Sequence, residues 1–370
     1  MAFKIDPNIS YAGTLRSEMH YALTQRRPAG YLMHRLRWRW LPRLGRVSRF
    51  PEHVDIETCS VCQLACPMCF QTVRKDISHG FMDFPLFERV MAEVAGRRPY
   101  SIRLSWRGEC LLHPEFARML HHARSVYDGS ISFLTNSLLL DERLMELLVR
   151  TRTDYIVISA DGVGSTYDSV RRPGVFDELV SRLGLLAQIK RRNGASYPKV
   201  RINAVGTWFT PEERAEFLRI FGPLSDRILI GEMLSNFAEH VPAHDASAFC
   251  ASPWQRLLVG WDGSVHPCCC DYAGLYPMGN VRETSLYDIW HGKRAHVLRK
   301  LVGEGRRLDL RLCRETDCGV DENDNECSEV FMGLLRAQVV RQHGLNSPLL
   351  RYLDCRGGEV CPRTGKMVAA

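Results

Sequence analysis

The residues with the clearest chemical meaning are three cysteines in one short run. Cys62-Gln-Leu-Ala-Cys66-Pro-Met-Cys69 has C-x3-C-x2-C spacing and follows a strand-like segment directly. Three thiolates on one tight loop can bind three irons of a [4Fe–4S] cluster and leave the fourth iron open to another ligand. The alternatives are a zinc site or buried structural cysteines, but a closed zinc site usually takes four ligands from paired C-x2-C elements. The spacing therefore predicts an iron–sulfur cluster.

This motif resembles that of the radical SAM superfamily, and the resemblance covers roughly residues 50–235. It implies that Cys62, Cys66 and Cys69 ligate a [4Fe–4S] cluster whose open iron chelates the methionine end of S-adenosylmethionine (SAM). Met68 matches the apolar position whose backbone faces the adenine. The resemblance further implies a reductant such as flavodoxin or ferredoxin, and cleavage of SAM to a 5′-deoxyadenosyl radical that abstracts hydrogen from a substrate.

A second element follows the next strand-like segment. Ser105-Trp-Arg107-Gly108-Glu109 looks like the Gly-Gly-Glu element of the same family, with Arg107 in place of the first glycine. The resemblance implies that Glu109 binds the SAM ammonium through a charge-assisted hydrogen bond. The alternative is that Glu109 is simply a solvated glutamate in a loop, because a Gly-Glu pair alone is not specific. Cys110 is either a hydrogen-atom donor to a substrate radical or an apolar filler of a tight loop.

Polar residues also end the third, fourth and fifth strand-like segments. Asn136 and Ser159 resemble family positions that line the SAM site, and Ser159 is the better candidate to contact the methionine carboxylate or the ribose. Turn chemistry is the alternative, since polar residues and glycine end strands for backbone reasons. Arg201 lies on the fifth segment, one face of which could meet the cofactor.

The late cysteines form a second constellation. Cys250 precedes Gly263-Ser-Val-His-Pro-Cys268, and Cys313 and Cys318 follow. Together with Met278-Gly-Asn-Val281, the pattern resembles the SPASM domain and its shortened form, the twitch domain. The full SPASM pattern holds two auxiliary clusters, but the late spacing Cys313-x4-Cys318-x8-Cys327 does not fit its compact cysteine run. We therefore predict one auxiliary [4Fe–4S] cluster, for which Cys250, Cys268, Cys313 and Cys318 suffice as ligands. A second auxiliary cluster is the alternative, and the cysteines left for it are Cys269, Cys270, Cys327, Cys355 and Cys361.

Short, β-branched-rich segments alternate with amphipathic ones ahead of these late cysteines. The predicted strands are 53–57, 101–105, 131–135, 155–159, 199–205 and 227–231, and the predicted helices are 85–97, 114–126, 141–150, 176–192 and 211–221. Six strand–helix units indicate a parallel sheet with right-handed crossovers. We predict an α/β fold, a partial (β/α)6 TIM-like barrel with its site at the carboxyl ends of the strands, and a small C-terminal Fe–S domain.

Composition changes mark the expected boundaries. We predict a basic N-terminal extension (1–50), the barrel (51–239), an auxiliary-cluster domain (240–327) with a helix at 286–301, and a C-terminal helix (328–342) and tail to residue 370. Fourteen cysteines, no export signal and no long apolar run favour a reducing, cytoplasmic setting, in which clustered cysteines bind metal.

The net charge of +7 is concentrated near the N-terminus. Residues 24–50 hold eight arginines and no acidic residue, and without them 41 basic side chains face 42 acidic ones. A general nucleic-acid binder is therefore excluded. Trp38 and Trp40 interleave with these arginines. The segment is either a helix packed on the barrel with solvated arginines, or a peripheral contact with an anionic membrane, or a site for an anionic substrate or partner.

The combined motifs indicate a radical SAM oxidoreductase. An open-iron motif with a SAM-binding glutamate has no use in a simple electron carrier. Only about 50 residues precede the barrel, without a strand pattern, whereas the family's peptide maturases often carry a peptide-binding module there. We therefore expect a hydroxylated small-molecule substrate of carbohydrate or aminocyclitol type and net oxidation. Epimerisation or decarboxylation, or modification of a peptide or protein, are the alternatives.

Overall fold

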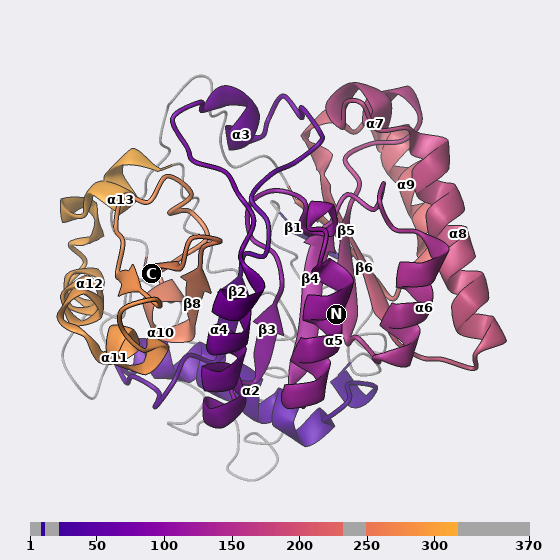
Figure 1. The fold of residues 1–370 in the computed structure, drawn as a ribbon. Helices are drawn as coiled ribbons and strands as arrows, with labels where there is room; N and C mark the ends of the chain where they lie inside the picture. The colour runs from indigo at the N-terminus through magenta and orange to yellow at the C-terminus, as the bar shows by residue number, and fades with distance from the viewer. Residues whose placement is uncertain (1–8, 12–21, 232–248, 317–370) are drawn as a thin grey trace, which may run out of the picture.

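A ten-stranded sheet organises the chain (Figure 1). The structure, a computed structural model, describes residues 9–11, 22–231 and 249–316. The strand order is β1-β7-β6-β5-β4-β3-β2-β8-β9-β10. The six predicted strands form its parallel centre: β2 (His53–Ile56), β3 (Ser101–Arg103), β4 (Ser130–Thr135), β5 (Tyr155–Ser159), β6 (Lys199–Val205) and β7 (Arg227–Gly231). The predicted α/β barrel is confirmed.

The helices of the crossovers cover one face of this sheet (Figure 1). They are α4 (Phe84–Arg97), α5 (Phe116–Val126), α6 (Glu142–Arg150), α7 (Ser165–Val170), α8 (Phe176–Arg192) and α9 (Pro211–Phe221). Their starts have local causes. Asp83 accepts a hydrogen bond from Leu86 N at the start of α4, and Thr210 accepts one from Glu213 N at the start of α9. Such caps satisfy amide groups that a helix leaves unpaired in its first turn.

Alternation along the strands separates an apolar face from a polar one. On β6, Val200 and Ile202 are buried in the core beneath the helices, whereas Arg201 and Asn203 are half-buried on the opposite face. A strand places successive side chains on opposite faces, so one face packs and the other lines the open barrel. The polar face is therefore available for chemistry.

Four strands lie outside the predicted set. β8 (Arg256–Val259) pairs in parallel with β2 as a seventh parallel strand, and β9 (Ser264–His266) and β10 (Gly279–Asn280) continue the sheet antiparallel. β1 (Ile9–Tyr11) pairs antiparallel with β7 at the other edge. The sheet therefore runs on through the region expected to hold the auxiliary cluster.

The helix predicted over 286–301 was wrong as a single element. It is two helices, α11 (Leu286–His291) and α12 (Lys293–Gly303), separated by Gly292 in extended conformation. A Cβ at Gly292 would approach the carbonyl oxygen of Asp288 to 2.9 Å. The break therefore needs glycine. Two short helices flank the pair, α10 (Ser252–Gln255) and α13 (Arg311–Glu315), and the predicted helix 328–342 lies outside the described residues.

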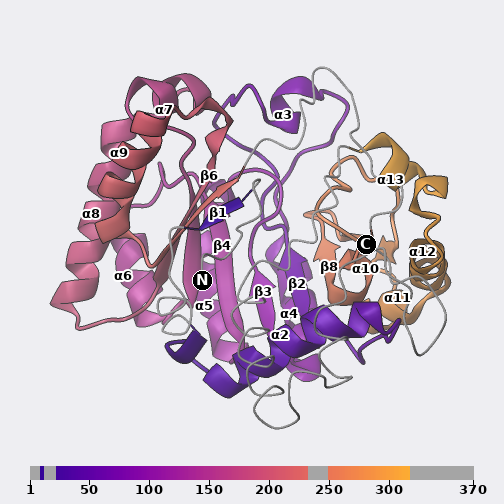
Figure 2. The ribbon, with the colours of Figure 1, turned by 180° about the vertical axis from the view of Figure 1, so that it is seen from behind.

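The arginine-rich segment forms α2 (Pro28–Arg43), which crosses the amino-terminal ends of the strands (Figure 2). Its prolines do not interrupt it, because Pro28 is in the first turn and Pro42 in the last. Trp38 is buried, with the Arg256 guanidinium 5.1 Å from its ring centre, while Trp40 is half-buried. No helix of the described part of the chain is both long and apolar enough to cross a bilayer.

Candidate functional site

The cysteine motif forms the loop between β2 and α3 (Phe70–Val73), at the carboxyl end of the sheet (Figure 1). Cys69 N donates to Cys66 O over 3.0 Å, and Ala65 N donates to Arg172 O, beyond α7, over 2.7 Å. All described cysteines are free thiols. Met68 is half-buried in the same loop. The loop is thus stabilised by a hydrogen bond within itself and by one to the segment that follows α7.

The thiols of this loop fit a cluster in their donor chemistry. Burial, as the largest influence, raises the pKa of Cys62 to about 11 and also raises the pKa of Cys66. The buried thiols would therefore lose their protons only next to a cation, and the iron of a cluster would supply that positive charge. No three His, Cys, Asp or Glu side chains within the described ranges converge on a single ion position. A [4Fe–4S] cluster does not need that, because each thiolate binds a different iron.

The Glu109 carboxylate is buried and held by the chain itself. Its Oε1 accepts hydrogen bonds from Thr135 Oγ1 over 2.7 Å and from Leu111 N over 3.1 Å, and its Oε2 accepts one from Asn136 N over 2.7 Å. The residue is 2% exposed. Burial raises its pKa, and the hydrogen bonds, which favour the carboxylate form, only partly offset this rise. It forms no ion pair with the described residues. The charge of Arg171 favours the carboxylate form from farther away, but no cation is paired with it. A fixed carboxylate with no paired cation is suited to an ammonium group.

Gly108 explains how Glu109 comes to lie against the cysteine loop. Its φ is +66°, and an added Cβ would lie 2.5 Å from Ser60 C and 2.6 Å from Val61 O. Glu109 N donates to the same Val61 oxygen over 2.8 Å. Only glycine permits this close approach. The two predicted elements, 62–69 and 108–109, therefore come together.

Arg107, which stands where the family has glycine, makes a buried ion pair. Its Nε and Nη2 donate to Glu57 Oε1 and Oε2 over 2.7 and 2.6 Å, and its Nη1 donates to Tyr272 O over 2.9 Å. Glu57, just beyond β2, is fully buried and also accepts from Trp261 N over 3.2 Å. The neighbouring Trp106 donates from Nε1 to Cys269 O over 3.1 Å. These contacts join the Glu109 loop to the late segment.

The other predicted SAM-site residues fall into two groups. Asn136 accepts from Gln63 Nε2 over 3.2 Å, so it contacts the loop directly. Ser159 is buried and pairs in register with Asn203, whose Oδ1 accepts from Arg201 Nε over 2.8 Å. The structure thus groups Asn136 with Glu109, and Ser159 with Arg201 on β5 and β6.

Sequence reasoning missed Arg171, which follows α7. Its guanidinium pairs with Asp161 over 2.5 Å, and Nη1 lies 4.0 Å from Cys66 Sγ as a hydrogen-bond donor. This is a positive charge against a predicted cluster ligand. Nothing in the local sequence indicates it, because the contact joins positions 105 residues apart.

Cys110 lies in the core, in the short helix Cys110–Leu112. Its thiol is fully buried and donates to Leu134 O over 3.4 Å, and burial raises its pKa well above the ordinary value. This packing favours the apolar-filler interpretation over a hydrogen-atom donor.

The late cysteines are only partly described. Cys250 and Cys313 pack against one small apolar cluster formed by Trp254, Leu298, Val302 and Leu310. Cys268 follows β9, and its carbonyl accepts from Asp271 N over 3.2 Å. Cys318, Cys327, Cys355 and Cys361 lie outside the described residues. Two of the four predicted auxiliary ligands, Cys250 and Cys313, therefore pack against the same group of apolar side chains.

Comparison with known proteins agrees with both motifs. Residues 56–218 match the model of the radical SAM superfamily, and residues 250–319 match the SPASM iron–sulfur cluster-binding domain. A cofactor-modifying protein for tungsten-containing aldehyde ferredoxin oxidoreductase, from Pyrococcus furiosus, is 23% identical over 66% of this chain and 82% of its own. A SAM-dependent 2-deoxy-scyllo-inosamine dehydrogenase from Niallia circulans is 25% identical over 70% of this chain and 90% of its own.

Solved structures share the fold. BtrN in complex with AdoMet and 2-DOIA has a TM-score of 0.53 and 17% identity, covering 76% of this chain and 98% of its own. Streptococcus suis SuiB bound to the precursor peptide SuiA has a TM-score of 0.57 and 14% identity, covering 84% and 86%. The chain is therefore an enzyme of the radical SAM superfamily, with SAM and a [4Fe–4S] cluster as cofactors and a SPASM domain for auxiliary iron–sulfur clusters.

Proposed function

We propose that this enzyme oxidises a hydroxylated small molecule of carbohydrate or aminocyclitol type at a carbinol carbon. When bound, SAM and its cluster would supply the hydrogen-abstracting radical, and an auxiliary cluster would supply an electron acceptor. In this balance the carbinol carbon loses a hydrogen atom, and the substrate then loses one electron and the hydroxyl proton to give a ketone. The named activity of the Niallia circulans relative supports this substrate class.

The buried Glu109 carboxylate beside the cysteine loop carries the proposal. It would accept the SAM ammonium, while Gly108 keeps it against that loop. The other proposed SAM-site residues are Met68, Asn136, Ser159 and Arg201. The proposed cluster ligands are Cys62, Cys66 and Cys69 for the SAM cluster, and Cys250, Cys268, Cys313 and Cys318 for the auxiliary cluster.

Replacing Glu109 with glutamine should weaken SAM binding about ten- to a hundredfold without loss of the cluster, because a charge-assisted hydrogen bond is lost. Binding needs the carboxylate form, and burial raises the pKa of Glu109. SAM affinity should therefore fall as the pH is lowered, starting above the usual titration range of glutamate, and this dependence should vanish in Glu109→Gln. Equilibrium SAM binding to reconstituted enzyme across pH measures both effects.

The matched control is Glu115→Gln, an exposed carboxylate at the start of α5 that pairs with Arg118. It should leave SAM affinity and its pH dependence unchanged. A wild-type affinity in Glu109→Gln would reject the proposed role.

Oxidation is favoured over epimerisation because Cys110 is enclosed in the core rather than exposed to a substrate radical. Turnover in deuterium oxide with hydroxylated substrates should give a ketone, equimolar 5′-deoxyadenosine and no stable carbon-bound deuterium at the reacting centre. Mass spectrometry and NMR of the product measure this. An isomeric product with such deuterium, lost in Cys110→Ala, would establish epimerisation instead. 5′-Deoxyadenosine formed only with a peptide would overturn the small-molecule proposal.

A further inference from the structure

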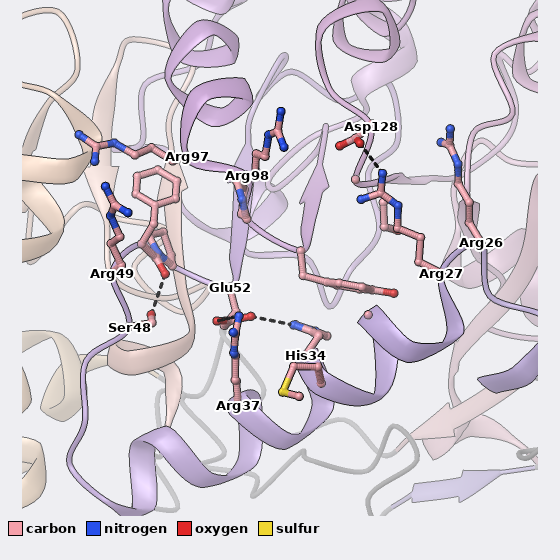
Figure 3. Close-up of a pocket in the computed structure, with 18 of the residues that line it drawn as sticks. Arg26, Arg27, His34, Arg37, Ser48, Arg49, Glu52, Arg97, Arg98 and Asp128 are labelled. Carbon is pink, nitrogen blue, oxygen red and sulfur yellow. Dashed lines mark hydrogen bonds and ion pairs between the residues drawn. The ribbon is translucent and has the colours of Figure 1, made fainter.

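A cavity of about 810 Å³ lies at the opposite end of the sheet from the cysteine loop. Its lining includes Glu52 before β2, Tyr100 before β3, Ser130 at the start of β4 and Asp154 before β5, with α2 along one side (Figure 3). Small-molecule sites in proteins are about 300–1,000 Å³. The cavity therefore has the size of a ligand site, and the SAM chemistry at the carboxyl ends of the strands does not use it.

Arginine dominates the charged residues of this cavity. They come from the two residues before α2 and from its middle, from the turn before β2 and from the end of α4, and Figure 3 shows them spread across the lining. The six lining arginines are Arg26, Arg27, Arg37, Arg49, Arg97 and Arg98. Like charges that line one cavity repel one another unless opposite charge is near.

Two of the four lining carboxylates are already in ion pairs. Asp128 pairs with Arg27. Asp154 pairs over 2.5 Å with Arg124, which is not part of the lining. Each of these two carboxylates therefore has its own ion pair, although the charge of Arg98 also acts on Asp128 and that of Arg26 on Asp154.

The remaining two carboxylates are also engaged. Glu93 accepts hydrogen bonds of 2.8 Å from the first two backbone N–H groups of α11. Glu52 lies 3.4 Å from His34 Nδ1 and 3.8 Å from Arg37, and burial raises its pKa to about 6. All four lining carboxylates are thus held by protein groups, and the six lining arginines outnumber them.

Several lining guanidinium groups form no ion pair. Arg26, Arg49 and Arg98 form no ion pair with any residue that the structure describes, and Arg97 lies 4.0 Å from the ring centre of Tyr287.

We propose that this cavity binds a ligand with phosphate groups. Guanidinium groups donate paired hydrogen bonds to phosphate oxygens, and several of them facing one space select a multiply charged anion. The phosphate could belong to a soluble ester or to an anionic phospholipid head group. Exposed Leu32, Met33 and Leu44 on and just beyond α2 would contact acyl chains in the second case.

The test uses reconstituted full-length enzyme and two probes, inorganic pyrophosphate and vesicles of phosphatidylglycerol with phosphatidylcholine. Calorimetry and vesicle sedimentation should detect binding of at least one probe. Arg49→Gln and Arg98→Gln should each weaken that binding about tenfold, and more in combination, because each removes charge-assisted hydrogen bonds. Binding of pyrophosphate identifies a soluble ligand, and binding of vesicles alone identifies a lipid.

The control is Arg143→Gln, an exposed arginine on α6 without an ion pair in the described structure. It should leave binding unchanged, and thermal melting should show that all variants remain folded. The proposal is overturned if neither probe binds, or if the Arg49 and Arg98 variants bind as tightly as the Arg143 variant.

Discussion

Replacing Cys62, Cys66 or Cys69 with alanine is expected to abolish formation of 5′-deoxyadenosine from SAM. Each change removes one of three thiolates from a loop that the structure holds through Cys69 N–Cys66 O and Ala65 N–Arg172 O. An iron–sulfur cluster with only two protein ligands loses iron. Without an intact cluster, no electron reaches SAM to cleave it. Chromatography of anaerobic reactions measures the nucleoside, and iron analysis measures the cluster.

Cys59 offers a matched control, because it lies three positions before the motif and is fully buried. Its thiol donates to Val61 O over 3.4 Å, which indicates a packing role. Cys59→Ala should keep SAM cleavage. If 5′-deoxyadenosine persisted at the wild-type level in any motif variant, or disappeared equally in Cys59→Ala, the assignment of the three ligands would fail.

Replacing Arg107 with methionine is expected to lower stability by about 3–5 kcal/mol, the usual effect of removing one partner of a buried ion pair. Glu57 is 0% exposed and would keep a charge with no cation opposite it. The hydrogen bond to Tyr272 O would also be lost. Chemical denaturation of the reconstituted enzyme, followed by loss of the cluster absorbance, measures the change.

The double variant Glu57→Gln with Arg107→Met should recover much of that stability, since no unpaired charge then remains buried. Arg219→Met breaks a similar two-contact pair with Glu216 on the surface of α9 and should change stability little. Equal losses in the Arg107 and Arg219 variants, or no recovery in the double variant, would contradict the role assigned to the buried pair.

Local pattern was enough for the centre of the fold. The strands predicted over 155–159, 199–205 and 227–231 have the bounds that the structure shows, because these short segments are rich in β-branched residues. β8 was missed. Its four residues, Arg256–Val259, lie among prolines and glycines, and its partner β2 is about 200 residues away. Only the tertiary structure supplies that pairing.

The candidate site divides in the same way. The cysteine spacing and the Gly108-Glu109 pair are local signals, and the structure brings them together. Arg171 beside Cys66 and Glu57 opposite Arg107 carry no local signal, because each contact joins separate loops of the barrel. Sequence reasoning therefore missed the charged residues that are distant in the sequence but lie beside the site in space.

The parallel pairing of β8 with β2 also bears on how the chain can be divided. If the chain ended before residue 249, β2 would become an edge strand with a row of unsatisfied backbone groups along its length. Such an edge is a template for association with other chains. We therefore expect a chain cut before β8 to aggregate more readily than the full chain.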